Sequence, residues 1–225
     1  MEQDMRRPRA RLTTPRAAAV AGILFSVLLI ISIVLIRLSI PDQPHDTGGW
    51  LKENGRAVTL ALNLVPFAGI AFLWFIGVVR DRIGEYEDRF FATVFLGSGL
   101  LFLAMLFASA ATAGGLLAFY QTVSGNQIVP DIYNYSRTIS LHIVNVYAVK
   151  MAGVFMISTC TLAHRTGIFP RWMAYLGFVL ALFLLLSVGF SYWAILVFPL
   201  WVLLISIHIL LANLHIPKEY IPQES

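Results

Sequence analysis

Long uncharged runs separated by short polar segments make up most of this chain. Between Phe90 and Leu214 only five side chains are charged at neutral pH, namely Asp131, Arg137, Lys150, Arg165 and Arg171. A helix needs about 20 consecutive apolar residues to cross the hydrocarbon core of a bilayer, and a surface this apolar is stable in lipid rather than in water. The pattern therefore predicts a helical, multi-pass membrane protein.

Charge-free windows divide the chain into six predicted spans. A basic N-terminal tail (1–16) precedes the membrane domain (17–214), and a short C-terminal tail (215–225) follows it. The predicted spans are 17–38, 57–79, 90–115, 138–163, 172–188 and 193–214. The last uncharged block is too long for one helix, and Gly189–Tyr192 is the turn that would divide it. The predicted fold is an all-α bundle of six transmembrane helices.

The third window stays uncharged from Phe90 to Tyr120. A helix of that length spans roughly 46 Å, which exceeds the thickness of the hydrocarbon core. Either the helix projects beyond the bilayer, or the Gly114–Gly115 pair bends or ends it.

Positive charges indicate how the six spans are oriented. Eleven Lys and Arg residues fall on the side of the N-terminus, five of them in its first sixteen residues, and three or four fall on the other side. The positive-inside rule then places both termini in the cytoplasm of a cell with an inner or plasma membrane. Because the N-terminal arginines directly precede an apolar run, the formal net charge of +4 indicates a membrane anchor, and we expect no nucleic-acid partner.

Few residues offer metal, haem or redox chemistry. Cys160 is the single cysteine, which excludes an internal disulfide and a cysteine-based metal site. Asp42, His45 and Asp46 form only a weak cluster of potential ligands. Two axial haem ligands must lie at one depth, whereas the predicted spans place His142 near the outer boundary and His208 in the inner leaflet. We therefore expect no metal and no cofactor.

Lys150 lies about twelve residues into the fourth predicted span, close to the bilayer midplane, at a cost of about 2.5–3.5 kcal/mol on insertion scales. None of the six windows contains a carboxylate that would pair with it. Three alternatives remain open. Lys150 is neutral because burial disfavours its charged form, or it is held by oxygens of Tyr147, Ser158 or helix carbonyls, or it faces a wet cavity or an anionic ligand.

Other polar groups near Lys150 complete the predicted binding site. His142, Asn145 and Tyr147 lie on the same span, and Asn63 lies on the second. Asn and His side chains also serve as hydrogen-bonding contacts between helices, so a purely structural role stays open for them. Pro66 and Pro199 are predicted helix kinks, since each proline removes a backbone hydrogen bond. Tyr120, Tyr133, Trp172 and Trp193 are expected at membrane interfaces.

Two functions from different classes fit these residues. One is the binding or transport of a small anionic or amphipathic molecule, such as a lipid, around Lys150. The other is a non-catalytic accessory subunit, in which small residues of the third span contact another helix of the bundle or a second copy in a homo-oligomer; these residues are Gly97, Gly99, Ala104, Ala108 and Thr112. An enzyme is not expected, because no nucleophile and base or group of metal ligands has credible spacing.

Two stretches resemble known families. Gly77-Val-Val-Arg-Asp81-Arg82-Ile-Gly84 resembles the G-x-x-x-D-R-x-G signature of major facilitator transporters, although Glu85 and Tyr86 replace the basic residues of that signature and this chain has half as many helices. Arg165–Trp172, followed by Tyr175-Leu-Gly177, is similar to the start of the fifth helix in six-helix bacterial membrane proteins that share a domain of unknown function. That resemblance implies a bacterial inner-membrane protein and assigns no site residue.

Overall fold

Nine helical segments make up the described part of the chain. The computed structural model describes residues 14–40, 50–83, 89–122, 130–166, 170–187 and 193–214. The α-helices are α1 (Thr14–Ser39), α2 (Trp50–Ile83), α3 (Arg89–Thr122), α4 (Pro130–His142), α5 (Val149–Thr166), α6 (Arg171–Leu186) and α7 (Val197–Leu214). A π-helical segment, η1 (Ile143–Ala148), joins α4 to α5, and a 3₁₀ turn, η2 (Ala194–Leu196), precedes α7. The prediction of an all-helical fold is confirmed for these residues.

Five stretches are long and apolar enough to cross a membrane, which agrees with a multi-pass membrane protein. They are Ala17–Ser39, Asn54–Arg80, Phe90–Thr122, Asp131–His164 and Ala194–Ala212. The remaining apolar helix, α6, has 16 residues. Its length of roughly 24 Å is less than the ~30 Å of a typical hydrocarbon core.

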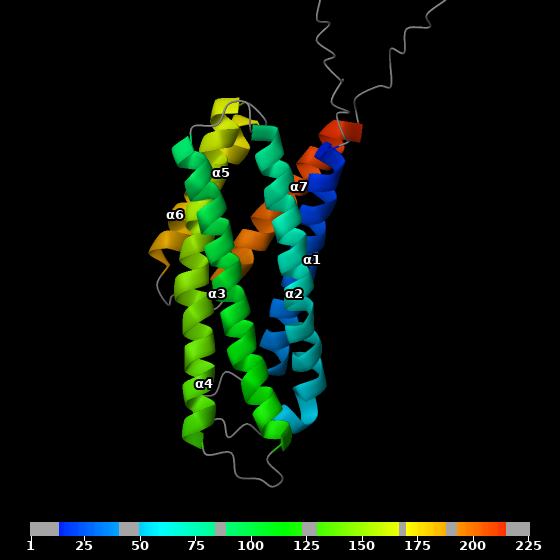
Figure 1. The fold of residues 1–225 in the computed structure, drawn as a ribbon, viewed down its shortest axis with the longest axis vertical. Helices are drawn as coiled ribbons and strands as arrows, with labels where there is room; N and C mark the ends of the chain where they lie inside the picture. Colours follow the sequence, from blue (N-terminus) through cyan, green and yellow to red (C-terminus); the bar gives the residue numbers. More distant parts are fainter. Residues whose placement is uncertain are drawn as a thin grey trace, which may run out of the picture.

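The helices form an elongated bundle whose two ends differ (Figure 1). α1 begins and α7 ends at one end, here called the terminal end. α3 ends and α4 begins at the opposite end, here called the far end. α6 and α7 meet only part of the way along the bundle, so the far end consists of α1, α2, α3 and α4 (Figure 1).

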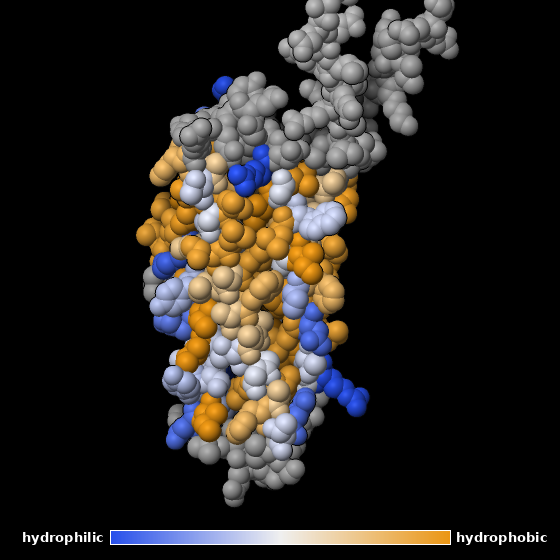
Figure 2. All heavy atoms as spheres, viewed as in Figure 1, coloured by the Kyte–Doolittle hydropathy of each residue, from blue (hydrophilic) through white to orange (hydrophobic). Residues whose placement is uncertain are grey.

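Surface polarity follows the same division. Figure 2 shows hydrophobic residues over the upper and middle parts of one face, and more hydrophilic residues toward the far end. α4 carries Asp131 and Arg137 and is the least apolar of the helices in this half. An apolar belt with a polar end is the surface expected of a bundle that projects from a bilayer.

A cluster of seven phenylalanines forms the centre of the bundle, and each of them is at most 1% exposed. Phe25 comes from α1, Phe72 and Phe75 from α2, Phe95 and Phe102 from α3, Phe155 from α5 and Phe198 from α7. Their ring centroids lie 4.5 Å apart for Phe25 and Phe72 and 4.7 Å apart for Phe102 and Phe198. The phenylalanine cluster therefore joins five helices through tilted and edge-to-face ring contacts.

Small residues and hydroxyls bring the helices close together around this cluster. Gly22 of α1 lies against Phe75 of α2 and Ser206 of α7, and a β-carbon added at Gly22 would overlap Ser206. Ser32 Oγ donates a hydrogen bond to the carbonyl of Ala61, 3.0 Å away, and so links α1 to α2. Such close approach stabilises helix pairs in membranes, where side chains gain little from leaving lipid.

Several helices, among them α2, α3 and α4, extend beyond the predicted spans. α3 continues through Gly114–Gly115 to Thr122, so the glycine pair does not end it. The helix of the fourth window begins at Pro130, eight residues before the predicted boundary at 138. Absence of charge selects residues that are stable in hydrocarbon, whereas a helix satisfies its own backbone groups in lipid and water alike and continues past that limit.

Phe72→Ala is expected to destabilise the protein by about 3–5 kcal/mol, because it leaves a cavity at the centre of the phenylalanine cluster. Phe67→Ala on the same helix is the matched control, since Phe67 is 61% exposed. Unfolding of both variants in detergent, followed by circular dichroism, measures the difference. Equal stability of the two variants would contradict a central role for the cluster.

Candidate functional site

A cavity of about 140 Å³ lies among the four helices of the far end. Its wall comes from the last three turns of α1, the first half of α2, the second half of α3 and most of α4, together with Val144 of η1 and Ile195 of η2. Most wall residues are Leu, Ile, Val or Ala, and the polar ones are four serines, two arginines and Tyr133. The far-end cavity is therefore an apolar space with a few fixed polar groups, as ligand pockets commonly are.

The cavity begins where the phenylalanine cluster ends. Four residues after Phe25 the wall residue is Leu29, and four residues after Phe102 it is Leu106. Ile195, three residues before Phe198, comes from the turn that leads into α7. Smaller side chains thus replace phenylalanines one turn further along each helix, while α6 and α7 contribute no further layer. Packing falls short of filling the space, and the cavity results.

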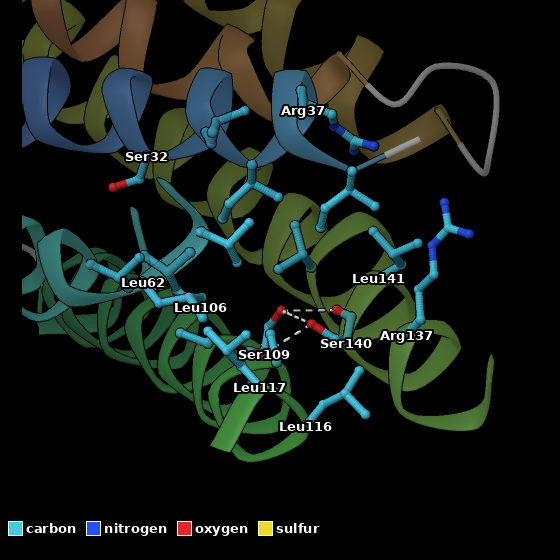
Figure 3. Close-up of a pocket in the computed structure, with 18 of the residues that line it drawn as sticks. Ser32, Arg37, Leu62, Leu106, Ser109, Leu116, Leu117, Arg137, Ser140 and Leu141 are labelled. Carbon is cyan, nitrogen blue, oxygen red and sulfur yellow. Dashed lines mark hydrogen bonds between the residues drawn. The ribbon is translucent and has the colours of Figure 1, made fainter. Parts of the chain in front are cut away.

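Two arginines from different helices line the cavity. Arg37 lies in the last turn of α1, and Arg137 lies on α4. Figure 3 shows both side chains extending toward the same side of the cavity. A guanidinium carries five N–H donors in a planar fork. This end of the cavity can bind a carboxylate or a phosphate through paired hydrogen bonds.

A reciprocal pair of serines joins α3 to α4 at the cavity wall (Figure 3). Ser109 Oγ lies 2.9 Å from Ser140 Oγ and 2.9 Å from the Ser140 carbonyl, and Ser140 Oγ donates to the Ser109 carbonyl at 3.0 Å. These hydroxyls are already hydrogen-bonded, as is Ser32. They hold the helices together and need no hydrogen bond from a ligand.

Lys150 lies elsewhere, at the level at which α6 ends. Its Nζ donates to the carbonyl of Leu185, 2.5 Å away, in the last turn of α6. The last carbonyls of a helix have no partner within that helix, and a cation is favourable at its C-terminus. Gly153, one turn along α5, lies against Leu185 and allows the two helices to approach. Of the three alternatives, the structure has Lys150 held by a helix carbonyl.

The other predicted ligand-binding residues are dispersed. His142 and Tyr147 are exposed, and their rings meet edge to face with centroids 5.9 Å apart. Asn145 is half-buried in η1, and Asn63 is exposed on α2. None of these residues, nor Lys150, is among the described residues that line the far-end cavity. The predicted binding site formed by these five residues stays a prediction, and it does not coincide with the far-end cavity.

The two prolines occupy different positions in their helices. Pro66 lies inside α2 and is exposed, whereas Pro199 is the third residue of α7. A proline in the first turn loses no helical hydrogen bond, because the first N–H groups have no partner within the helix. The 3₁₀ turn before Pro199 and the π-helical η1 are the irregular segments that border the cavity, through Ile195 and Val144.

Tyr133 is one of the cavity residues whose position the sequence did not predict. The tyrosine was expected at a membrane interface, but it is 1% exposed and packs with Val58 and Leu117 in a small core at the far end. Arg37 and Arg137 had served only to orient the spans. The available signal was that each arginine directly borders a charge-free window. In the six-span prediction Arg37 follows the first span and Arg137 precedes the fourth, so both lie at the same end of the bundle.

Comparison of the chain with protein-family models, curated proteins and solved structures gives no match. Both family resemblances therefore stay predictions, and Gly84–Tyr86 of the facilitator-like stretch lie outside the described residues. Asp42, His45 and Asp46 also lie outside them. Within the described ranges, no three His, Cys, Asp or Glu side chains are grouped so that they could hold a metal ion.

Lys150→Met is expected to leave the Leu185 carbonyl without its partner and to destabilise the end of α6 by about 1–3 kcal/mol. Hydrogen exchange at the last turn of α6, measured by mass spectrometry, should become faster. Lys150→Arg keeps a donor and is the control. Unchanged exchange in Lys150→Met would contradict the anchoring role.

Proposed function

We propose that this protein is an integral membrane protein that binds or transports a small organic anion with an apolar part, in the far-end cavity. Six helices would cross the membrane, with both termini in the cytoplasm of an inner or plasma membrane. The far end would then open toward the extracytoplasmic side. The distribution of Lys and Arg supports this orientation.

The observation that carries the proposal is the combination of apolar wall and arginines in one cavity. Arg37 and Arg137 come from helices that are distant in sequence, yet both line the same space. Cavities formed only by imperfect packing are apolar, and charged groups are costly beside them. Two guanidiniums at one side add charged N–H donors that a purely apolar cavity lacks, and such donors can hydrogen-bond the oxygens of an anionic ligand.

The far-end cavity replaces Lys150 as the proposed site. Lys150 precedes Arg165 by fifteen residues, or about 22 Å of helix, so with Arg165 at the inner boundary of a core of about 30 Å it would lie in the outer third instead of at the predicted midplane. Its bond to the Leu185 carbonyl satisfies it at that depth without a ligand. Lys150 then has a structural role, because its bond to Leu185 joins α5 to α6.

Arg37→Gln and Arg137→Gln are each expected to weaken ligand binding about tenfold or more, because each removes charge-assisted hydrogen bonds to the anion. Purified protein in lipid nanodiscs would be titrated calorimetrically with carboxylates from butyrate to palmitate. Arg56→Gln is the control, as Arg56 is exposed on α2 and does not line the cavity. Failure of every carboxylate to bind in an arginine-dependent way would overturn the proposed function.

The orientation has a separate test. A green fluorescent protein fused to the C-terminus should fluoresce, and an alkaline phosphatase fused there should be inactive, because the C-terminus is expected in the cytoplasm. The reverse result would place the far-end cavity on the cytoplasmic side. Fusions after Arg16, before the first predicted span, provide the second reference point.

An accessory subunit is the second candidate function, and one observation favours it. Ala104, Ala108 and Ala111 are exposed along one side of α3, where small residues allow a second helix to approach closely. Gly99 by contrast is buried against Ile76 and Phe155. If Ala108→Trp changes the oligomeric state or releases a co-purifying protein while ligand binding is absent, the accessory role is favoured over binding.

A further inference from the structure

We infer that the ligand is a compact aryl or short branched-alkyl acid, with a carboxylate or phosphate head between Arg37 and Arg137 and an apolar part about the size of a benzene ring in the far-end cavity. This inference rests on the proposed function and narrows it. It predicts that the long tails of single-chain lipids and fatty acids do not fit inside this cavity.

The size of the cavity limits the apolar part. Its volume of about 140 Å³ is close to that of an engineered apolar cavity of ~150 Å³ that binds benzene. Phe25, Phe102 and Phe198 close the space toward the terminal end, one turn beyond Leu29, Leu106 and Ile195. Because those rings are in contact with one another, a long chain cannot extend toward the terminal end.

The chemistry of the wall determines what the buried part can be. Ser109 and Ser140 satisfy each other, and Ser32 is bonded to the Ala61 carbonyl. The two buried polar atoms without a described partner, Trp201 Nε1 and Ser206 Oγ, belong to residues outside the cavity wall. Three of the four wall serines therefore have partners within the protein, and a hydroxyl or amide placed beside them would lose its hydrogen bonds to water. The buried part is therefore mainly hydrocarbon.

The arginines determine the head group. They lie on the same side of the cavity and approach from α1 and α4 (Figure 3). Planar guanidiniums match the two oxygens of a carboxylate and those of a phosphate monoester equally well. An acid with its charge at one end and a ring at the other fills both parts of the site at once.

A ligand series tests the size and the charge separately. Phenylacetate and phenyl phosphate are expected to bind the full-length protein in nanodiscs, whereas acetate and inorganic phosphate, which lack the ring, bind at least about tenfold more weakly. Phenylethanol, which keeps the ring without the charge, is also expected to bind more weakly. Arginine-dependent binding of either aromatic acid supports the inference.

Two matched variants place the ring in the cavity. Ala110→Phe fills the space beside Ser109 and should abolish binding of phenylacetate, whereas Ala104→Phe on the exposed side of α3 should not change it. Leu117→Ala enlarges the cavity and should allow naphthylacetate to bind at least as tightly as phenylacetate. Each variant would first be checked for an unchanged helical spectrum, and the Leu117→Ala result stands even if Ala110→Phe does not fold.

The outcomes separate this inference from the proposed function. Saturable, arginine-dependent binding of palmitate that is tighter than binding of phenylacetate would overturn the compact ligand and leave the proposed function in place. Binding of phenylacetate that survives both Ala110→Phe and the loss of Arg37 would also overturn the inference. Absence of arginine-dependent binding for every acid overturns both.

Discussion

Close contact among seven phenylalanines is the interaction on which the rest of the bundle depends. In lipid the surroundings of a helix are as apolar as its side chains, so burial alone does not drive helices together, and packing and hydrogen bonds take over. Phe72 illustrates this role, because its ring contacts rings of α1, α3, α5 and α7. The helices of the terminal half are positioned by that cluster, and glycines and serines adjust their spacing.

The same cluster explains why the far half is different. A ring layer can be continued only if every helix supplies another large residue one turn further, and here the next positions carry Leu29, Leu106 and Ile195. α6 also ends before this level, so the number of helices falls where the side chains become smaller (Figure 1). Both changes leave space, and the serine pair fixes α3 and α4 to each other at the wall of that space.

Sequence patterns predicted the helices much better than the site. Charge-free windows identify residues stable in hydrocarbon, and each window contains a helix, because a chain in lipid must satisfy its backbone groups internally. The depth at which helices end depends on tertiary packing, which the windows do not contain. Residues 130–137 were placed outside the fourth predicted span because they are charged, yet these first two turns of α4 carry Arg137 to the cavity. Arg37 and Arg137 are a hundred residues apart, and no local pattern in the sequence shows that they line one cavity.

Lys150 shows how an isolated charge in a membrane helix can mislead. Lys150 stood out because no carboxylate lies near it in the predicted spans. The end of a helix offers carbonyl oxygens that can take the place of a carboxylate. Composition does not reveal where a neighbouring helix ends. The Leu185 carbonyl is available because α6 is only 16 residues long. α6 also ends before the level of the far-end cavity, whose lining includes no described residue of α6 (Figure 1). One structural feature, a short helix, thus supplies the carbonyl that satisfies the lysine and leaves fewer helices around the cavity that the arginines line.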